Sequence, residues 1–206
     1  IRFSNSNSDL TDRVHNFQYT ISFLNTSEFS AAFNNRLVQL LSPFDPSRTG
    51  GLELPTGDIQ RWQEYNIRYR TNSRNRLNAS VRVQYGGFFN GNRFQISGSI
   101  NYRFQPYGSI ALTGNYNSVD LPEGFNDTNF LLIGPRIDLT FTDKIFLTTF
   151  VQYNEQADNL NLNARFQWRF KPVSDLFVVY TENYLPESIA SKNRALVLKL
   201  TYWLNL

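Results

Sequence analysis

Cysteine and methionine are both absent from the 206 residues, and His15 is the only histidine. Without cysteine the chain has no disulfide, no thiol nucleophile and no zinc–thiolate site, and it gives no hint of a redox compartment. Its N-terminus also lacks the basic-then-apolar stretch of a signal peptide. We therefore expect either a chain whose signal peptide has been removed or a piece of a longer protein.

Charge and long apolar runs are scarce as well. Charged residues make up 18% and aromatic residues 16% of the chain, and the mean hydropathy is −0.40. No run approaches the roughly 20 apolar residues that a membrane helix needs. The net charge of +3 is too small to indicate nucleic acid without a clustered basic face. We expect no nucleic-acid partner.

Residues 159–170 (NLNLNARFQWRF) carry the clearest pattern in the chain. Every second residue is apolar, and every residue between is an amide or an arginine. A period of two predicts an extended strand with one apolar and one polar face. At ~3.3 Å per residue and a tilt near 45°, such a strand rises roughly 25 Å along a barrel axis, which is about the height of an outer-membrane apolar band.

The same alternation recurs along the chain, and no helical period is found. It predicts eleven strands, at residues 14–24, 28–41, 61–71, 76–86, 93–104, 110–117, 131–141, 144–154, 159–170, 176–181 and 194–206. A loss of phase near Leu37-Val38 predicts a β-bulge. Pro135 lies inside a predicted strand and cannot donate to a ladder, which predicts a local irregularity. Residues 144–154 and 176–181 are apolar on both sides, so their facing is ambiguous.

The connections alternate in length. Short turns (NTS, NSRN, QPY, TDK, KPVSD) alternate with generally longer segments (42–60, GGFFNGN, SVDLPEGFND, EQADN, 182–193). Outer-membrane barrels show this asymmetry, with short periplasmic turns and longer outer loops. The predicted fold is therefore an all-β, antiparallel up-and-down transmembrane β-barrel of about 11–12 strands in the Gram-negative outer membrane, with the C-terminus periplasmic.

The strand count bears on how much of the barrel is present. Closed bacterial single-chain barrels have an even number of strands, so eleven strands lead us to expect at least one more before residue 14. We therefore expect the C-terminal part of a larger barrel. Residues 1–13 would be the polar tail of an outer loop, and residues 14–206 would be barrel strands. The alternative is a soluble β-sandwich, which also alternates, but its strands are shorter.

The polar face of the predicted strands is rich in basic residues and poor in acids, which include Glu64 and Asp138. The predicted lumen-lining basic residues are Arg68, Arg70, Arg82, Arg103, Arg136, Arg165, Arg169 and Lys199. One interpretation is a basic lumen that attracts anionic solutes or an acidic plug. The other, which we favour, is an ordinary polar lumen whose arginines bond to neighbouring groups.

Signals for chemistry are weak. His15 has no catalytic companion, and no GxSxG, P-loop, HExxH or dinucleotide fingerprint occurs. The VDLPEG loop with Asp127 is better explained as a solvated loop than as a calcium site. We therefore predict no catalytic residue, no metal site and no cofactor, and we do not expect this chain to be an enzyme by itself.

Residues 146–184 (FLTTFVQYNEQADNLNLNARFQWRFKPVSDLFVVYTENY), with GGFFNGNR and VDLPEG upstream, resemble a group of Bacteroidota outer-membrane proteins. These proteins have an N-terminal carbohydrate-binding-family-9-like domain and a C-terminal β-barrel region of unknown function. The resemblance covers most of residues 40–185. It implies a Gram-negative outer membrane and a missing N-terminal portion, but it carries over no catalytic motif and no site residue.

Three functions follow from these observations. The first is a membrane anchor or solute passage for a larger, glycan-handling envelope protein. The second is an accessory subunit of a larger outer-membrane assembly for transport or secretion. The third is the barrel of a hydrolase whose active site lies upstream. The expected partners are outer-membrane lipid and either the protein's own N-terminal domain or another envelope protein.

Overall fold

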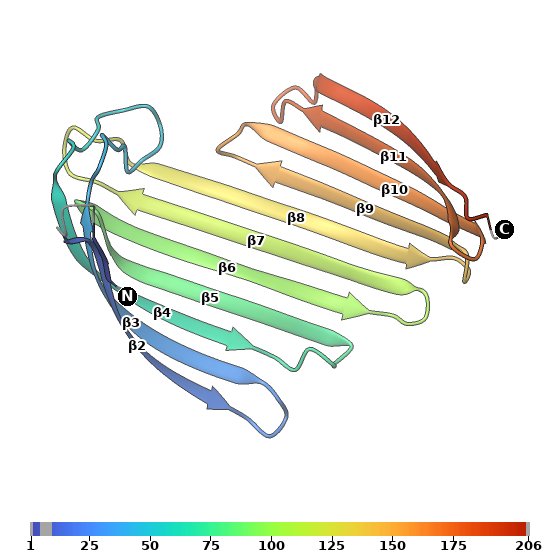
Figure 1. Cartoon of the computed structure of the whole chain (residues 1–206), viewed down its shortest axis with the longest axis horizontal. Helices are drawn as coiled ribbons and strands as arrows, with labels where there is room; N and C mark the ends of the chain where they lie inside the picture. The colour runs from blue at the N-terminus through green and yellow to red at the C-terminus, as the bar shows by residue number, and fades with distance from the viewer. Residues whose placement is uncertain (1, 5–9, 205–206) are drawn as a thin grey trace. The chain divides into compact units, whose positions relative to one another are not determined.

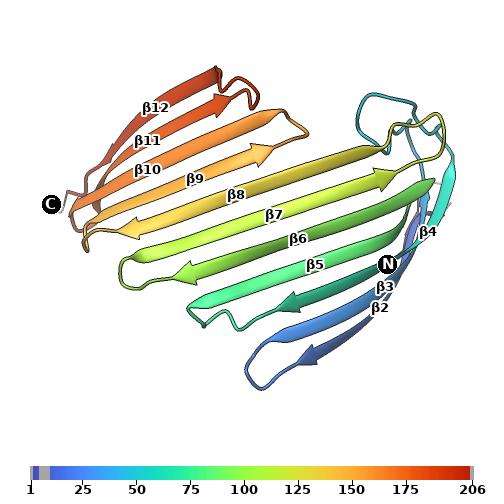
Figure 2. The same ribbon diagram turned by 180° about the vertical axis from the view of Figure 1, so that it is seen from behind.

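The computed structural model describes residues 2–4 and 10–204, and within them the chain forms twelve β-strands. Their bounds are β1 (Arg2–Ser4), β2 (Leu10–Ser22), β3 (Glu28–Gln39), β4 (Ile59–Arg70), β5 (Leu77–Phe88), β6 (Gly91–Arg103), β7 (Gly108–Asp120), β8 (Thr128–Thr140), β9 (Ile145–Asn154), β10 (Asn159–Lys171), β11 (Ser174–Tyr184) and β12 (Ser191–Thr201). The hydrogen-bonded order follows the chain from β1 to β12 in one sheet (Figures 1 and 2). The predicted all-β, up-and-down antiparallel arrangement is confirmed.

The strands belong to two compact units. The first unit consists of the described parts of Ile1–Ser73 together with Ser80–Gly98 and Asn115–Phe130. The second consists of Arg74–Ala79, Ser99–Gly114 and the described part of Leu131–Leu206. Among the described residues there is no helix of the length and apolarity that crossing a membrane requires.

Each of the eleven predicted strands corresponds to one of β2 to β12. The N-terminal segment differs from the expectation, because β2 begins at Leu10 rather than near residue 14 and the short β1 pairs with it, Phe3 opposite Asp12. Residues 1 and 5–9 of the expected polar tail lie outside the described residues. So do residues 205–206, with which the last predicted strand ends.

The β-bulge predicted near Leu37-Val38 is wrong. The register of β3 with β4 runs without a shift from Glu28 opposite Arg70 to Gln39 opposite Ile59. Leu37 therefore lies on the apolar face, as the alternation requires, and Val38 lies on the polar face. The sequence pattern lost its phase because an apolar residue lies on the polar side, not because the backbone gained a residue.

The irregularity predicted at Pro135 is confirmed. In the ladder of β8 with β9, Ile133 lies opposite Tyr153 and the next paired position is Arg136 opposite Phe150. The ladder passes over Gly134 and Pro135 without changing register. This is the expected result of a residue that lacks a backbone N–H.

Two predicted outer loops are shorter than expected. β5 continues to Phe88, so the turn before β6 contains only Phe89 and Asn90. β11 continues to Tyr184 and β12 starts at Ser191, so the expected 182–193 loop shrinks to residues 185–190. Glu182, which was expected in that loop, is therefore a strand residue.

The structure also resolves the facing of the two ambiguous strands. Thr148 donates from Oγ1 to Asp138 Oδ1 over 2.8 Å, which places the even-numbered residues of β9, including Phe150, on the polar face. Asn163 donates from Nδ2 to Thr181 Oγ1 over 2.7 Å. The odd-numbered residues of β11 therefore lie on the polar face, and its even-numbered residues lie on the apolar face.

The connection between β3 and β4, residues 40–58, is the longest and folds around Asp45. Its Oδ1 accepts hydrogen bonds from the backbone N–H of Ser47 (2.8 Å) and the Ser47 hydroxyl (2.5 Å). Its Oδ2 accepts bonds from the N–H groups of Thr49, Gly50 and Gly51. Partial burial would raise the pKa of Asp45, but the bonds from Ser47, Gly51 and Gly50 outweigh it and lower the pKa from 3.8 to about 2.

This connection is joined to the one between β7 and β8, residues 121–127. Asn126 donates from Nδ2 to Thr49 Oγ1 over 3.0 Å, and Figure 1 shows the two connections at the same end of the strands. Asp127, considered above as a calcium ligand, instead accepts the N–H of Leu121 over 2.8 Å and closes its own loop.

Candidate functional site

The polar face of the sheet carries the predicted basic residues. In the first unit, Arg68 lies opposite Arg82 on β5 and opposite Ser30 on β3. Arg70 lies opposite Glu28 and Ser80. All three arginines share the face of Glu64, because residues that pair directly lie on the same side of a sheet.

In the second unit, Arg165 and Arg169 lie on the polar face of β10. Arg165 is opposite Thr148 and Val179, and Arg169 is opposite Asp175. Lys199 lies opposite Phe177, on the same face. Arg68, Arg70 and Arg82 belong to the first unit, and the other five predicted basic residues belong to the second.

Several of these cations have polar partners. Arg136 donates from Nε and Nη2 to the two oxygens of Asp138, each over 2.9 Å. The Nε of Arg169 lies 3.4 Å from Asp175 Oδ1, and Nη2 of Arg70 lies 3.2 Å from Glu28 Oε2. Arg103 donates from Nη2 to the backbone carbonyl of Asn75 over 2.8 Å. These contacts support the interpretation in which the arginines bond to neighbouring groups.

Glu64 is the centre of the polar face in the first unit. Its side chain is almost wholly buried, and its Oε1 accepts hydrogen bonds from Asn34 Nδ2 (3.0 Å) and Arg36 Nε (2.8 Å). Its Oε2 accepts a bond from Gln84 Nε2 (2.8 Å) and lies 3.7 Å from Arg93 Nη2. One carboxylate thereby joins side chains from β3, β4, β5 and β6.

Arg36 and Arg93 were missing from the predicted basic residues. Arg36 lies in the part of β3 where the alternation is interrupted at Leu37-Val38, and Arg93 is the first residue of the predicted strand 93–104. A strict period of two carried through Leu37-Val38 would have placed Arg36 on the face of Asn34. The same period places Arg93 on the polar side of its strand with Gln95 and Ser97.

An aromatic cluster lies beside the Glu64 network. The ring of Phe89, in the β5–β6 turn, is 5.0 Å from Trp62 of β4 and 4.7 Å from Phe44 of the long connection. Arg93 lies over the Phe88 ring at 4.3 Å. The long connection is therefore held against the strand ends by ring contacts.

The second unit has a polar-face cavity of about 460 Å³. Its walls include Arg136, Arg165, Thr148 and Asn163, with Phe150 beside them. Asp138 is close to these groups but is already engaged by Arg136 and Thr148. The cavity thus offers guanidinium and amide donors on a face that an aqueous lumen would wet.

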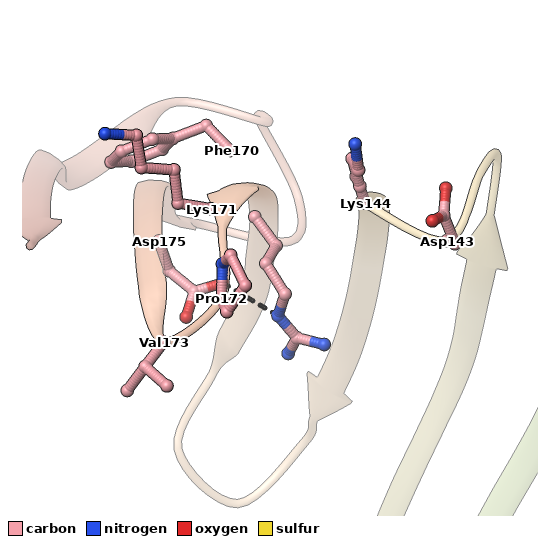
Figure 3. Close-up of a pocket in the computed structure, with 8 residues that line it drawn as sticks. Asp143, Lys144, Phe170, Lys171, Pro172, Val173 and Asp175 are labelled. Atoms are coloured by element: carbon pink, nitrogen blue, oxygen red, sulfur yellow. Dashed lines mark ion pairs between the residues drawn. The ribbon is translucent and has the colours of Figure 1, made fainter. Parts of the chain in front are cut away.

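A second cavity, of about 630 Å³, lies at the short-turn ends of β8 to β11 (Figure 3). Lys144, Lys171, Asp143 and Asp175 line it, and in the view of Figure 3 Phe170 lies beside Lys171. Lys171 donates to the Tyr202 hydroxyl over 3.1 Å and lies 5.2 Å from the centre of its ring. The mixture of acids and engaged cations does not define a site for one kind of ion.

The apolar face contains one buried carboxylate in the second unit. Glu182 lies opposite Leu162 and Arg194, and its Oε2 accepts hydrogen bonds from the hydroxyls of Tyr180 and Tyr184. The bond from Tyr184 is 2.5 Å long. The carboxylate on this face is thus accommodated by two tyrosine hydroxyls, with the cation Arg194 at the position opposite it.

His15 is exposed on β2 opposite Asn35. Within residues 2–4 and 10–204, no three His, Asp or Glu side chains lie close enough together to hold a metal ion. The side chains of the polar face bind one another and can offer hydrogen bonds and charge to a solute.

No protein-family model matches the chain, and no curated protein matches it. Among solved structures, the chain is similar to one described as "KdgM porin in complex with disordered oligogalacturonate". The TM-score is 0.36 and the identity 11%, over 84% of this chain and 90% of that chain. A likeness of this size says nothing about what this chain binds. The resemblance to the Bacteroidota proteins stays a prediction.

Proposed function

We propose that this chain is part of the wall of an outer-membrane β-barrel, with its apolar face against lipid and its polar face toward an aqueous lumen. The observation that carries the proposal is the burial pattern. Polar side chains are buried and large apolar side chains are exposed, which is the reverse of the pattern in a water-soluble protein. Among the described residues, the buried hydrophobic ones are only Leu37, Leu40, Leu54 and Val119. The buried polar or charged ones are Thr11, Ser27, Asn34, Ser47, Glu64, Thr128, Ser174 and Glu182.

Neighbouring residues of one strand show the inversion directly. On β4, Glu64 is 2% exposed, whereas Tyr65 is 55% and Ile67 is 50% exposed. A water-soluble sheet would bury such side chains, because each large apolar side chain that is taken out of water contributes about 1.5–3 kcal/mol. Hydrocarbon provides the same gain without a second protein layer.

The strand lengths fit the same environment. β6, β7, β8 and β10 each contain 13 residues, longer than the ~9–11 residues with which a tilted strand crosses the apolar band. Globular strands usually have about five or six residues. Length and inverted burial together favour lipid over a soluble sandwich.

The role that we propose is a membrane anchor or a solute passage within a larger envelope protein. The polar face supports passage, because its cavity offers arginine and amide donors at Arg136, Arg165 and Asn163. The link to a glycan-handling N-terminal portion and to Bacteroidota rests on the sequence resemblance alone. The short turns would face the periplasm, which would place the C-terminus there.

Membrane insertion is tested by producing the full-length protein in a Gram-negative host and washing its outer-membrane fraction with urea and with carbonate. We expect the protein to remain with the membrane, and to migrate differently on a gel before and after heating. Release by either wash, or a monodisperse protein in buffer without detergent, would contradict the proposal.

Anchoring and passage are separated by reconstituting the same protein in planar bilayers. Stepwise conductance supports passage. Membrane-inserted protein without conductance supports anchoring. This result would contradict an open lumen but would agree with the proposed lipid-facing surface.

A further inference from the structure

The outward, apolar face of β2 to β5 is organised in rows that cross the strands. One row is aromatic and consists of Phe17, Phe33, Tyr65 and Tyr85, which lie opposite one another in register. The rings of Phe17 and Phe33 are 6.5 Å apart, and those of Phe33 and Tyr65 are 5.4 Å apart. The following rows, toward the short turns, are mainly aliphatic and aromatic, and Ile67 and Val83 belong to the first of them.

The rows on the other side of the aromatic row are polar and basic. The first consists of His15, Asn35 and Gln63, and the second of Arg13, Leu37 and Arg61. Neither row contains an acid. A surface that changes from aliphatic to aromatic to cationic matches the order of acyl chains, interface and phosphate groups in an anionic leaflet.

A cavity of about 430 Å³ opens beside these rows. Asn35, Gln63 and Arg61 line it together with Trp62, Phe89 and Asn90. The Oδ1 of Asn90 is buried and has no hydrogen-bond partner in the protein. The Nε of Arg13, in the outer basic row, is likewise buried without a partner.

These unpaired atoms limit the kinds of ligand that can bind in the cavity and at the basic rows. Asn90 Oδ1 is an acceptor and calls for a group that donates, such as a hydroxyl. Arg13 Nε is a donor, and the guanidinium of Arg61 matches a phosphate. A ligand that carries both hydroxyl and phosphate groups satisfies all of them.

We propose that the basic rows and the adjoining cavity bind the phosphorylated saccharide headgroup of an outer-leaflet glycolipid. Its phosphate lies against Arg13 and Arg61, its sugar hydroxyls against Asn35, Gln63 and Asn90, and its acyl chains against the aromatic row and the rows beyond. A glycerophospholipid has the phosphate but lacks the hydroxyl-rich ring that the amide-lined cavity accommodates. This inference rests on the proposed function, because the rows meet a lipid leaflet only if the apolar face is in a membrane.

The test is a lipid titration of the full-length protein in detergent, followed by native mass spectrometry. The probes are bisphosphorylated lipid A, the same lipid A without its phosphates, and phosphatidylglycerol. We expect bisphosphorylated lipid A to bind at least about tenfold more tightly than either of the other two, because only it supplies both phosphate and sugar. Equal affinity for the phosphorylated and dephosphorylated forms, or for phosphatidylglycerol, would overturn the proposal.

A double variant, Arg13→Gln with Arg61→Gln, should lose about tenfold or more in affinity for bisphosphorylated lipid A. Arg70→Gln on the polar face of β4 is the matched control and should bind like the unchanged protein. Unchanged binding by the double variant contradicts the proposal. If the double variant does not assemble, the comparison of the three lipids on the unchanged protein still decides.

The two proposals fail in distinguishable ways. Release of the protein from washed outer membranes contradicts the membrane barrel itself. Stable insertion without a preference for phosphorylated lipid A contradicts only the glycolipid site.

Discussion

Arg36 Nε lies 2.8 Å from Glu64 Oε1 and joins β3 to β4 through a carboxylate that is almost wholly buried. The same carboxylate accepts hydrogen bonds from Asn34 and Gln84. On a face that a lumen would wet, the sheet is thus held by a fully engaged ionic network rather than by apolar packing. A buried carboxylate with several donors persists only while its partners remain.

Glu64→Gln should therefore destabilise the protein substantially. The variant leaves Arg36 and Arg93 without their anion, and breaking a buried ion pair from one side costs about 3–5 kcal/mol. Urea unfolding of the vesicle-inserted protein measures the loss. Glu28→Gln is the control, because its pair with Arg70 is largely exposed and should be worth less than about 1 kcal/mol. Equal effects of the two variants would show that the Glu64 network is not structural.

The two faces of β10 should tolerate arginine very differently. The sequence alone suggests Leu162→Arg as the damaging change, but Glu182 lies opposite Leu162 on the apolar face and would pair with the new cation. Phe166 is the better position, because its neighbours are Leu147 and Val178.

Phe166→Arg should impair membrane assembly by about 2–4 kcal/mol if it reaches the middle of the bilayer. Asn163→Arg, on the polar face beside Thr181, should assemble nearly normally. The amount of protein in washed outer membranes is the readout, and comparable yields for the two variants would mean that the faces are assigned wrongly.

The fold of the long connection between β3 and β4 should depend on acid pH. The pKa of Asp45 is about 2 in the folded protein, below its ordinary value of 3.8. A lowered pKa means that the folded loop favours the carboxylate, so this contribution is complete above about pH 4 and is lost as the pH falls toward 2. Amide hydrogen exchange at Thr49 and Gly50 should accelerate over that window. Asp45→Asn should show faster exchange already at neutral pH, and an unchanged rate in that variant would contradict the role of Asp45.

If the protein conducts, Arg165 should bias the current toward anions. It lines the polar-face cavity of the second unit, whereas Arg136 there is matched by Asp138. Arg165→Glu should shift the reversal potential in a salt gradient toward cations, and Arg165→Lys should leave it nearly unchanged. A lumen that is already cation-selective would contradict the prediction.

The strands were predictable from the sequence because a long strand with one apolar and one polar face has a period of two in its sequence. Residues 159–170 show this most clearly, and β10 occupies nearly the same range. The pattern failed where one side chain broke the alternation without changing the backbone, as Val38 does. It also failed where a polar residue on the apolar face was taken for a loop, as happened with Glu182.

The polar face was less predictable than the strands. Period alone places Arg68 and Arg82 on one side, but it does not show which cation meets which acid. The contacts of Glu64 join residues that are 20 to 30 positions apart in the sequence, so they depend on the register between strands. The register is set by the pairing of two whole strands, so it cannot be predicted from the sequence of one strand alone.

The measurement that tests the lipid-facing surface most directly is a nitroxide scan along β10, which the absence of cysteine makes straightforward. Single cysteines replace residues 161 to 168 in turn, and collision rates with oxygen and with a water-soluble nickel reagent are measured in the reconstituted protein. Oxygen collisions should peak at the even positions, including Ala164 and Phe166, and nickel collisions at the odd positions. Nickel collisions that are equally frequent at both sets of positions would contradict a face covered by hydrocarbon.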